Sequence, residues 1–397
     1  MTRYPWAAHY LPVPGSRSTL VRELMQDLGV LRGGDWEERH LCFSPQERLF
    51  LHGRWQEGIE PELAATSRDR ADFRRFQDLI AEQRSSGEFT IPMELGAKLS
   101  PLDAITMKDW LARHRLTSPY LHWYVDYACR DDYGASSGST SAWAGVHYFA
   151  AREHDEKGPL TWPEGNGWIA EKLISRVKSR IHTNAPVVSI RRNGTSMRVM
   201  TPSVEYVARQ VIFAAPSFLS RYVLEGAYPV PFEYSPWITA NLTLDRLPRE
   251  KGSEPAWDNV IYDSPSLGYV VATHMSLRTH RDASVWTWYH ALVGGGASEQ
   301  RRSLLQHDWS YWKEFILRDL ERAHPDIREC VSRIDLMRMG HAMVRPTPGS
   351  IFSHERQRLV RGLPGVTFAN ADLSGFSVFE EAQYRGVAAA DKVLKRI

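Results

Sequence analysis

The carboxyl-terminal segment constrains the fold most, because it joins a short apolar strand almost directly to a helix. Gly365–Asn370 follows a Pro-Gly turn and has the length and apolar character of a buried strand. After Asp372, the run Ser377-Val378-Phe379-Glu380 has the form of a capping box that opens a helix. One face of that helix carries apolar and small residues, which let it lie close to a sheet: Phe379, Ala382, Gly386, Ala389, Ala390 and Val393. The segment therefore predicts a buried strand followed by a helix that packs on a sheet.

This strand–loop–helix unit has two interpretations. Free backbone N–H groups at a helix start, beside the carboxylate of Asp372, form a site for an anion or a polar ligand. The alternative is an ordinary docking unit with no ligand. The physics of the segment alone leaves both open.

Four motifs, taken together, resemble one family. Ala369–Ala389 is similar to the closing motif of FAD-dependent amine oxidases and of related desaturases such as phytoene desaturase. Pro163–Gly167 is similar to a helix start of that superfamily, Val187 falls where its adenine-contacting Val lies, and a strand ends in Ala215-Pro216 as the family's does. The resemblance covers residues 160–220 and 340–397 well and the segments between them loosely.

The resemblance implies a two-domain α/β fold, with a discontinuous first domain and FAD as the cofactor. A Rossmann-like, GDI-like FAD-binding domain is expected from residues 1–43, 160–235 and 345–397. A substrate domain of mixed sheet and helices is expected from residues 44–159 and 236–344. The flavin would supply the redox chemistry for an apolar, cyclic or amine small molecule.

The resemblance also assigns residues to the site. The residues expected near the cofactor are Asp372, Ser377, Val378 and Glu381 on the flavin side, and Val187, Ala215 and Pro216 on the adenosine side. The cavity wall is expected to include Trp286, Trp288, Tyr289 and Phe376, with His341 either a substrate contact or a core histidine. Aromatic clusters of this kind belong more often to a core than to a site.

The chain departs from the family pattern in two places. No Gly-x-Gly-x-x-Gly turn after an apolar strand is present, since Gly165–Ala170 follows Trp-Pro-Glu and is interpreted as a helix start. The chain thus resembles the family from beyond its first flavin-binding unit, as a fragment, a mis-started product or half of a split protein would. The alternative function is a non-catalytic remnant or partner subunit that does not bind FAD on its own. The strand 237–244 also lacks the Lys of many amine oxidases, which weakens amine oxidation and leaves other substrates open.

Charge and composition exclude several other classes. Lys plus Arg is 49 and Asp plus Glu is 47, a net charge of +2, so charge alone recruits neither nucleic acid nor an anionic membrane. No apolar run approaches the roughly 20 residues of a membrane span. The three scattered cysteines suit reduced thiols in the cytoplasm, and no histidine spacing suggests a metal. Besides a small-molecule substrate, the partners considered are a second copy in a homodimer and a companion segment.

The pair Asp131-Asp132 after Arg130 has two interpretations, a paired acid/base set or, more commonly, a solvated charge turn. Among the elements, Ser44-Pro45-Gln46-Glu47 predicts a helix start, and residues 298–323 predict one long helix. Other predicted elements are helices at 72–80, 106–115, 118–129 and 168–180, a meander over 187–214, and strands at 237–244, 267–273, 284–292 and 332–339.

Overall fold

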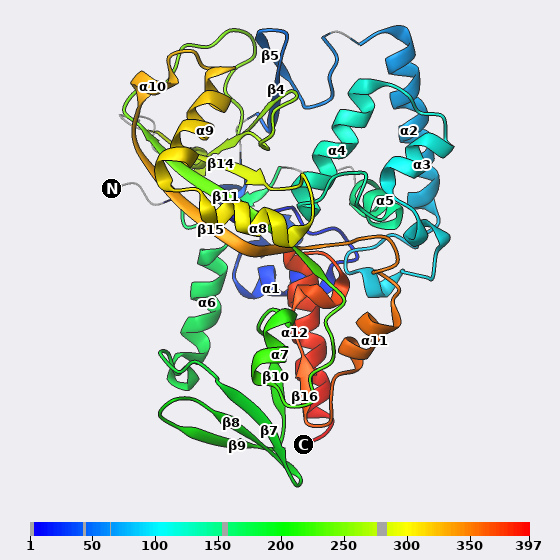
Figure 1. Ribbon diagram of the computed structural model, residues 1–397, viewed down its shortest axis with the longest axis vertical. Helices are drawn as coiled ribbons and strands as arrows, with labels where there is room; N and C mark the ends of the chain where they lie inside the picture. The colour runs from blue at the N-terminus through cyan, green and yellow to red at the C-terminus, as the bar shows by residue number, and fades with distance from the viewer. Residues whose placement is uncertain (1–3, 43–44, 64, 153–157, 276–283) are drawn as a thin grey trace.

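The computed structural model describes residues 4–42, 45–63, 65–152, 158–275 and 284–397. They form a mixed α/β fold, as predicted, with a large sheet flanked by helices and a smaller strand–helix region below it (Figure 1). None of the described helices has the length and apolar character that crossing a bilayer requires.

The main sheet has seven strands in the order β15-β11-β14-β13-β12-β4-β5. Their bounds are β4 Glu47–Leu51, β5 Arg54–Glu57, β11 Glu233–Leu244, β12 Asp258–Ile261, β13 Tyr269–Val271, β14 Ser284–Ala291 and β15 Val331–Arg345. Every neighbouring pair is antiparallel except β4 and β12, which run parallel with Glu47 opposite Asp258. The parallel pair brings two carboxylates side by side at one end of the sheet.

Helices cover both faces of this sheet. On one face, Ile238 and Leu242 of β11 and Trp286 of β14 pack with Trp312 and Ile316 of α9 (Trp309–Glu321). The other face carries Leu49, Val260 and Trp237, which pack with Tyr127 of α4 (Pro119–Tyr133). Because both faces are covered, β11 is buried along nearly its whole length, although polar residues alternate with apolar ones from Ile238 to Leu244.

A helical block lies beside the sheet. It contains α2 (Ser67–Ser85), α3 (Met107–Arg113), α4 and α5 (Ala142–Ala150). Helix α5 is buried on nearly every side, so its sequence shows no polar face and no helical period that would predict it.

A second region lies at the other end of the molecule (Figure 1). The parallel pair β10 (Val211–Phe213) and β16 (Val366–Phe368) packs against α12 (Phe379–Leu394). The meander β7 (Ser189–Asn193), β8 (Ser196–Met200) and β9 (Glu205–Ala208) forms a separate three-stranded sheet. The helices of this region are α1 Thr19–Asp27, α6 Gly167–Val177, α7 Ser220–Val223 and α11 His354–Arg361.

The remaining short elements complete the described chain. They are β1 Tyr10–Leu11, β2 Leu31–Arg32, β3 Asp35–Trp36, β6 Leu160–Thr161, α8 Ala297–Gln306 and α10 Ile327–Cys330.

Three local predictions are wrong. Glu47 begins strand β4 and not a helix, because its strand pairs with β12. The predicted helix 298–323 is two helices, since Asp308 caps α9 by accepting a hydrogen bond from the Tyr311 N–H at 2.9 Å. Ser377 does not cap α12: the helix begins at Phe379, and the Ser377 hydroxyl accepts the Val344 N–H at 3.2 Å.

Candidate functional site

Asp372 lies at the centre of the carboxyl-terminal turn, where it anchors a neighbouring loop. Its Oδ2 accepts the Ser217 N–H at 2.7 Å and the Tyr234 hydroxyl at 2.6 Å. Desolvation by burial raises the pKa of Asp372, and the hydrogen bonds from Tyr234 and Ser217 oppose that rise. Asn370 also donates to the Ala215 carbonyl at 2.6 Å. The structure therefore brings Asp372 together with the Ala215-Pro216 motif.

Glu381, on the first turn of α12, is engaged by protein groups through both oxygens. Oε1 accepts the Met93 N–H and Oε2 accepts the Ser374 hydroxyl, each at 2.6 Å. Val378 stands at the N-cap position, and no side chain caps the helix there. Val187, expected on the adenosine side, is 39% exposed and lies outside the β7 strand, and Pro216 is also exposed. The cofactor roles of these residues stay predictions.

Two of the aromatic residues predicted for the cavity wall lie in the core of the main sheet. Trp286 stacks on Tyr269 with ring centroids 4.0 Å apart. Trp288 is fully buried and donates its indole N–H to Asp319 Oδ2 at 3.0 Å. Both side chains pack among sheet and α9 residues, which is the core arrangement that such clusters usually have.

The other three predicted wall residues are spread over the molecule. Tyr289 is half-buried and hydrogen-bonds to the His9 ring and to the Ala7 carbonyl. His341 is exposed and stacks on Phe218 at 4.2 Å. Phe376 is buried in the helical block beside His147, at 4.7 Å between ring centroids. The structure does not bring the five residues into one wall.

Acidic side chains converge instead at the junction of the sheet and the helical block. We call this group the carboxylate–tyrosine cluster, and it consists of Glu47, Asp131, Asp132, Asp258, Tyr10, Tyr124, Tyr127 and Tyr148. Glu47 and Asp258 come from the parallel strands β4 and β12. Tyr124, Tyr127 and Asp131 recur at three- and four-residue spacing, so they share one face of α4.

The cluster is partly buried, and its carboxylates keep accessible surface. Desolvation by burial is the largest cause that raises the pKa of Asp131 to about 7 and of Asp132 to about 6, followed for Asp131 by the charge of Asp132. Burial raises the pKa of Asp258 well above its usual range and also raises that of Glu47, in both cases ahead of a neighbouring carboxylate. None of these four carboxylates is sealed from water, and Glu47 is exposed.

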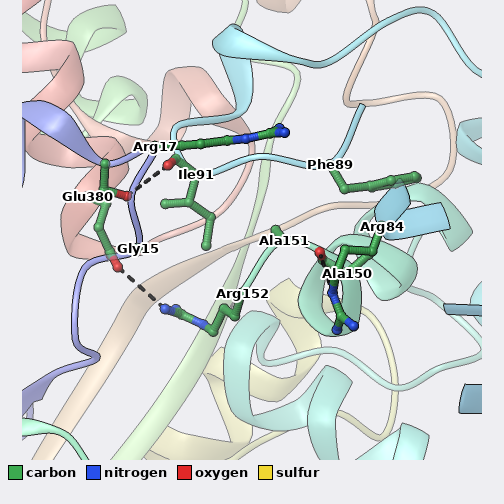
Figure 2. A pocket seen from close by; sticks show the side chains of 10 residues that line it. Gly15, Arg17, Arg84, Phe89, Ile91, Ala150, Ala151, Arg152 and Glu380 are labelled. Carbon is green, nitrogen blue, oxygen red and sulfur yellow. Dashed lines mark hydrogen bonds and ion pairs between the residues drawn. The ribbon is translucent and has the colours of Figure 1, made fainter. Parts of the chain in front are cut away.

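A pocket of about 140 Å³ lies at the start of α12 (Figure 2). Glu380 and Arg152 line it, and Arg152 donates to Glu380 Oε1 at 3.4 Å. Arg152 and Glu380 also act electrostatically on Asp132, which links the pocket to the cluster. Glu380 is 2% exposed, and its Oε2 has no hydrogen-bond partner.

Two other arginines of the pocket are directed elsewhere. Arg84 donates to the Phe149 carbonyl at 2.6 Å, and Arg17 donates to the Gly87 carbonyl at 3.4 Å. In Figure 2 both guanidinium groups extend away from Glu380, whereas that of Arg152 reaches toward it.

Sequence reasoning found part of this group. The pair Asp131-Asp132 is visible as a motif, but the structure places both residues in α4, half-buried, and not in a turn. Glu47 is hidden because its Pro-containing context resembles a helix start. Asp258 and Tyr148 carry no sequence signal, since only the sheet pairing and the position of α5 bring them to the cluster.

The second region offers polar groups that suit a bound cofactor. Among its buried side chains, Ser220 Oγ, Thr367 Oγ1 and Gln383 Oε1 have no hydrogen-bond partner. Thr367 lies on β16 and Gln383 on α12, which pack together, and the first turn of α12 has no side-chain cap. Unpaired polar groups beside an uncapped helix start fit a cofactor that supplies polar atoms. Within the described residues, no group of three or more His, Cys, Asp or Glu side chains is placed to hold a metal.

Comparison by sequence identifies no relative. No family model matches this chain, and no curated protein is significantly similar to it.

Comparison by structure finds oxidases. Cyclohexylamine oxidase from Brevibacterium oxydans superposes with a TM-score of 0.70 and 14% identity over 98% of this chain and 87% of its own. Putrescine oxidase bound to putrescine gives a TM-score of 0.72 at 13% identity over the same shares. A putative protoporphyrinogen oxidase from Exiguobacterium gives 0.62 at 15% identity, over 98% of this chain and 86% of its own. At these identities the likeness shows the fold, which is that of FAD-dependent amine oxidases and related flavoenzymes.

Proposed function

We propose that this protein, whose fold is that of FAD-dependent amine oxidases, is an FAD-dependent oxidoreductase acting on an apolar, cyclic or amine small molecule. The observation that carries the proposal is the superposition of 98% of the chain on oxidases of that fold. The four sequence motifs support it independently, because they come from the residues and not from the superposition.

In this proposal the second region holds the cofactor, and it is built from residues 1–43, 160–235 and 345–397. The substrate is held by residues 44–159 and 236–344. Bound FAD supplies a two-electron acceptor for the substrate. Asp372 is a positioning residue: through the Ser217 N–H it fixes the loop that follows Ala215-Pro216. Thr367 and Gln383 offer the unpaired polar atoms that the cofactor would satisfy.

A second candidate, a subunit that does not bind FAD alone, has its own supporting observation. Glu381, one of the residues expected at the cofactor, has both carboxylate oxygens occupied by protein donors, the Met93 N–H and the Ser374 hydroxyl.

The absorption spectrum of the purified, desalted chain, with and without added FAD, tests the first proposal against the second. We expect a retained flavin band. We also expect Asp372→Asn to weaken FAD binding by roughly tenfold or more, since Ser217 and Tyr234 lose a charged acceptor.

The matched control is Asp391→Asn, an exposed carboxylate on the same final helix, which should leave FAD affinity unchanged. A folded chain that stays colourless at saturating FAD would contradict the first proposal and support the subunit. Equal FAD affinity in both variants would remove Asp372 from the site.

A further inference from the structure

Helix α6 leaves the body of the protein after its first turn. Ile169 is buried in a core cluster with Leu11 and Leu160, whereas every residue from 170 to 184 is exposed. In Figure 1 the helix extends away from the main sheet toward the meander at the far end of the molecule. Most of α6 is therefore exposed to solvent around its whole circumference.

The exposed part of α6 is amphipathic. Leu173, Ile174 and Val177 lie within one arc of the helix, and Ile181 follows Val177 at four-residue spacing. The side chains of these four residues are 40–49% exposed. A helix of this length is marginal in water when it stands alone. An uncovered apolar arc on such a helix indicates an interaction surface.

Basic side chains border the apolar arc on both sides. At roughly 100° per residue, Lys172 and Arg176 lie on one flank of the arc and Lys178 lies on the other. All three are exposed, and Arg176 also pairs with the exposed Asp27 at 3.5 Å. Long basic side chains can rest their methylene groups on an apolar layer while their charged ends stay in water.

Positive charge is concentrated at this end of the molecule. Residues 167–210 contain eight Lys or Arg and two Glu, which gives this stretch a net charge of +6 in a chain whose total is +2. The rest of the chain is therefore net negative. An anionic surface would attract this end and repel the remainder, so the charge distribution also fixes an orientation.

We propose that α6 and residues 178–188 bind the surface of an anionic phospholipid bilayer. Leu173, Val177 and Ile181 enter the boundary between headgroups and acyl chains, and the flanking Lys and Arg side chains contact the headgroup phosphates. A bilayer covers one arc of a helix and leaves its polar arc in water, which matches the pattern of α6. The proposal goes beyond the redox function and does not depend on it.

Co-sedimentation of the purified chain with two kinds of vesicle tests the charge requirement. One kind is phosphatidylcholine alone, and the other contains about 30% phosphatidylserine. We expect binding to the anionic vesicles to be at least about tenfold stronger, and to weaken as salt is raised. Equal binding to both kinds would overturn the proposal. A folded chain that binds neither would also overturn it and would favour an acidic protein as the partner of α6.

A double variant tests the apolar arc. Leu173→Ser with Val177→Ser should lower the affinity for anionic vesicles by about tenfold or more, because both side chains lose their place among acyl chains. The matched control, Leu99→Ser with Leu247→Ser, changes two leucines outside α6 that are even more exposed, at 84% and 60%. It should leave affinity unchanged. Equal loss in both double variants, or none in the first, would contradict the assignment to α6.

A second pair of variants tests the basic flanks. Lys172→Gln with Lys178→Gln should lower affinity for the anionic vesicles by about tenfold and leave the weak binding to phosphatidylcholine unchanged. The control, Lys108→Gln with Lys251→Gln, removes the same charge from exposed positions outside residues 167–210 and should have little effect. Circular dichroism confirms folding in each variant. Equal effects of the two charge pairs would mean that no oriented surface exists.

Discussion

The main sheet and the region from α6 to α7 differ in how far their large apolar side chains are buried. In the sheet, Ile238, Leu242 and Trp288 are fully buried between layers of helices. Residues 173–222, by contrast, supply 12 of the 24 large apolar side chains that are exposed among the described residues. They are Leu173, Ile174, Val177, Ile181, Val187, Val188, Met200, Val204, Val207, Ile212, Leu219 and Tyr222. Burial on both faces thus characterises only the sheet.

Helix α6 shows where the difference begins. Ile169, Leu173 and Val177 follow one another at four-residue spacing, so they form one stripe. Ile169 packs with Leu11 and Leu160, whereas Leu173 and Val177 stay exposed. The same stripe is therefore core at its first turn and surface from its second turn onward.

The largest effect is expected in the sheet. Trp288→Ala should lower the free energy of unfolding by about 3–5 kcal/mol, because it leaves a cavity and removes one of the hydrogen-bond donors to the buried Asp319 carboxylate. Urea unfolding followed by fluorescence measures it. The matched control is Trp309→Ala, a half-exposed tryptophan of α9 that should cost much less. Similar losses of unfolding free energy in the two variants would mean that burial between the sheet and its helices does not determine how much each tryptophan contributes to stability.

A pH-dependent effect of intermediate size is expected from the carboxylate–tyrosine cluster. The pKa of Asp131 is raised from 3.8 to about 7, so between these values the folded chain holds a proton that the unfolded chain has lost. Stability contributed by this group is therefore present at low pH and falls as pH rises toward 7. The melting temperature should therefore decrease between pH 5 and pH 8. We expect this decrease to be smaller by a few degrees in Asp131→Asn than in the wild type.

Other groups titrate near Asp131, so the comparison is between the slopes of the variant and the wild type, not between absolute values. The charged and titratable neighbours are Glu47, Arg130, Asp132, Arg152 and Asp258, with Tyr10, Tyr127 and Tyr148. Parallel slopes would show that Asp131 ionises freely and that the cluster is not enclosed.

The smallest effect is expected on α6. Replacing both Leu173 and Val177 by Ser should change the free energy of unfolding by no more than about 0.5 kcal/mol per site, since both are already exposed. Ile169→Ser on the same stripe is the contrasting variant and should cost severalfold more. A large loss from the first pair would mean that these residues are covered in solution, which would break the contrast with the sheet.

Sequence reasoning succeeded where a local signal sufficed. Helix α4 begins at Pro119 after Ser118, as its cap predicts, and the strand at Val366–Phe368 ends before Asp372 as expected. The carboxyl-terminal motif and the Ala215-Pro216 motif were each visible, and the structure joins them through Asn370 and Asp372.

Sequence reasoning failed where contacts between distant segments determine the local structure. Glu47 enters a strand because β12 is available beside it, and no local pattern reports that partner. Two carboxylates, Glu47 and Asp258, become neighbours only through this parallel pairing. Trp286 and Trp288 were candidates for a ligand wall, but packing against α9 makes them core. The site thus depends on contacts between segments that lie about 200 residues apart.

Strand β11 has a mechanical consequence. It begins beside the carboxyl-terminal turn, where Tyr234 contacts Asp372, and it continues to Leu244 inside the main sheet. Throughout most of that length it is hydrogen-bonded to β15, whose last residue, Arg345, donates to the Leu292 carbonyl at 2.8 Å. Two paired strands therefore cross from one region to the other, with a register shift between Ser235 and Trp237. We expect the regions to move as one body, with ligands entering by loop and side-chain motion.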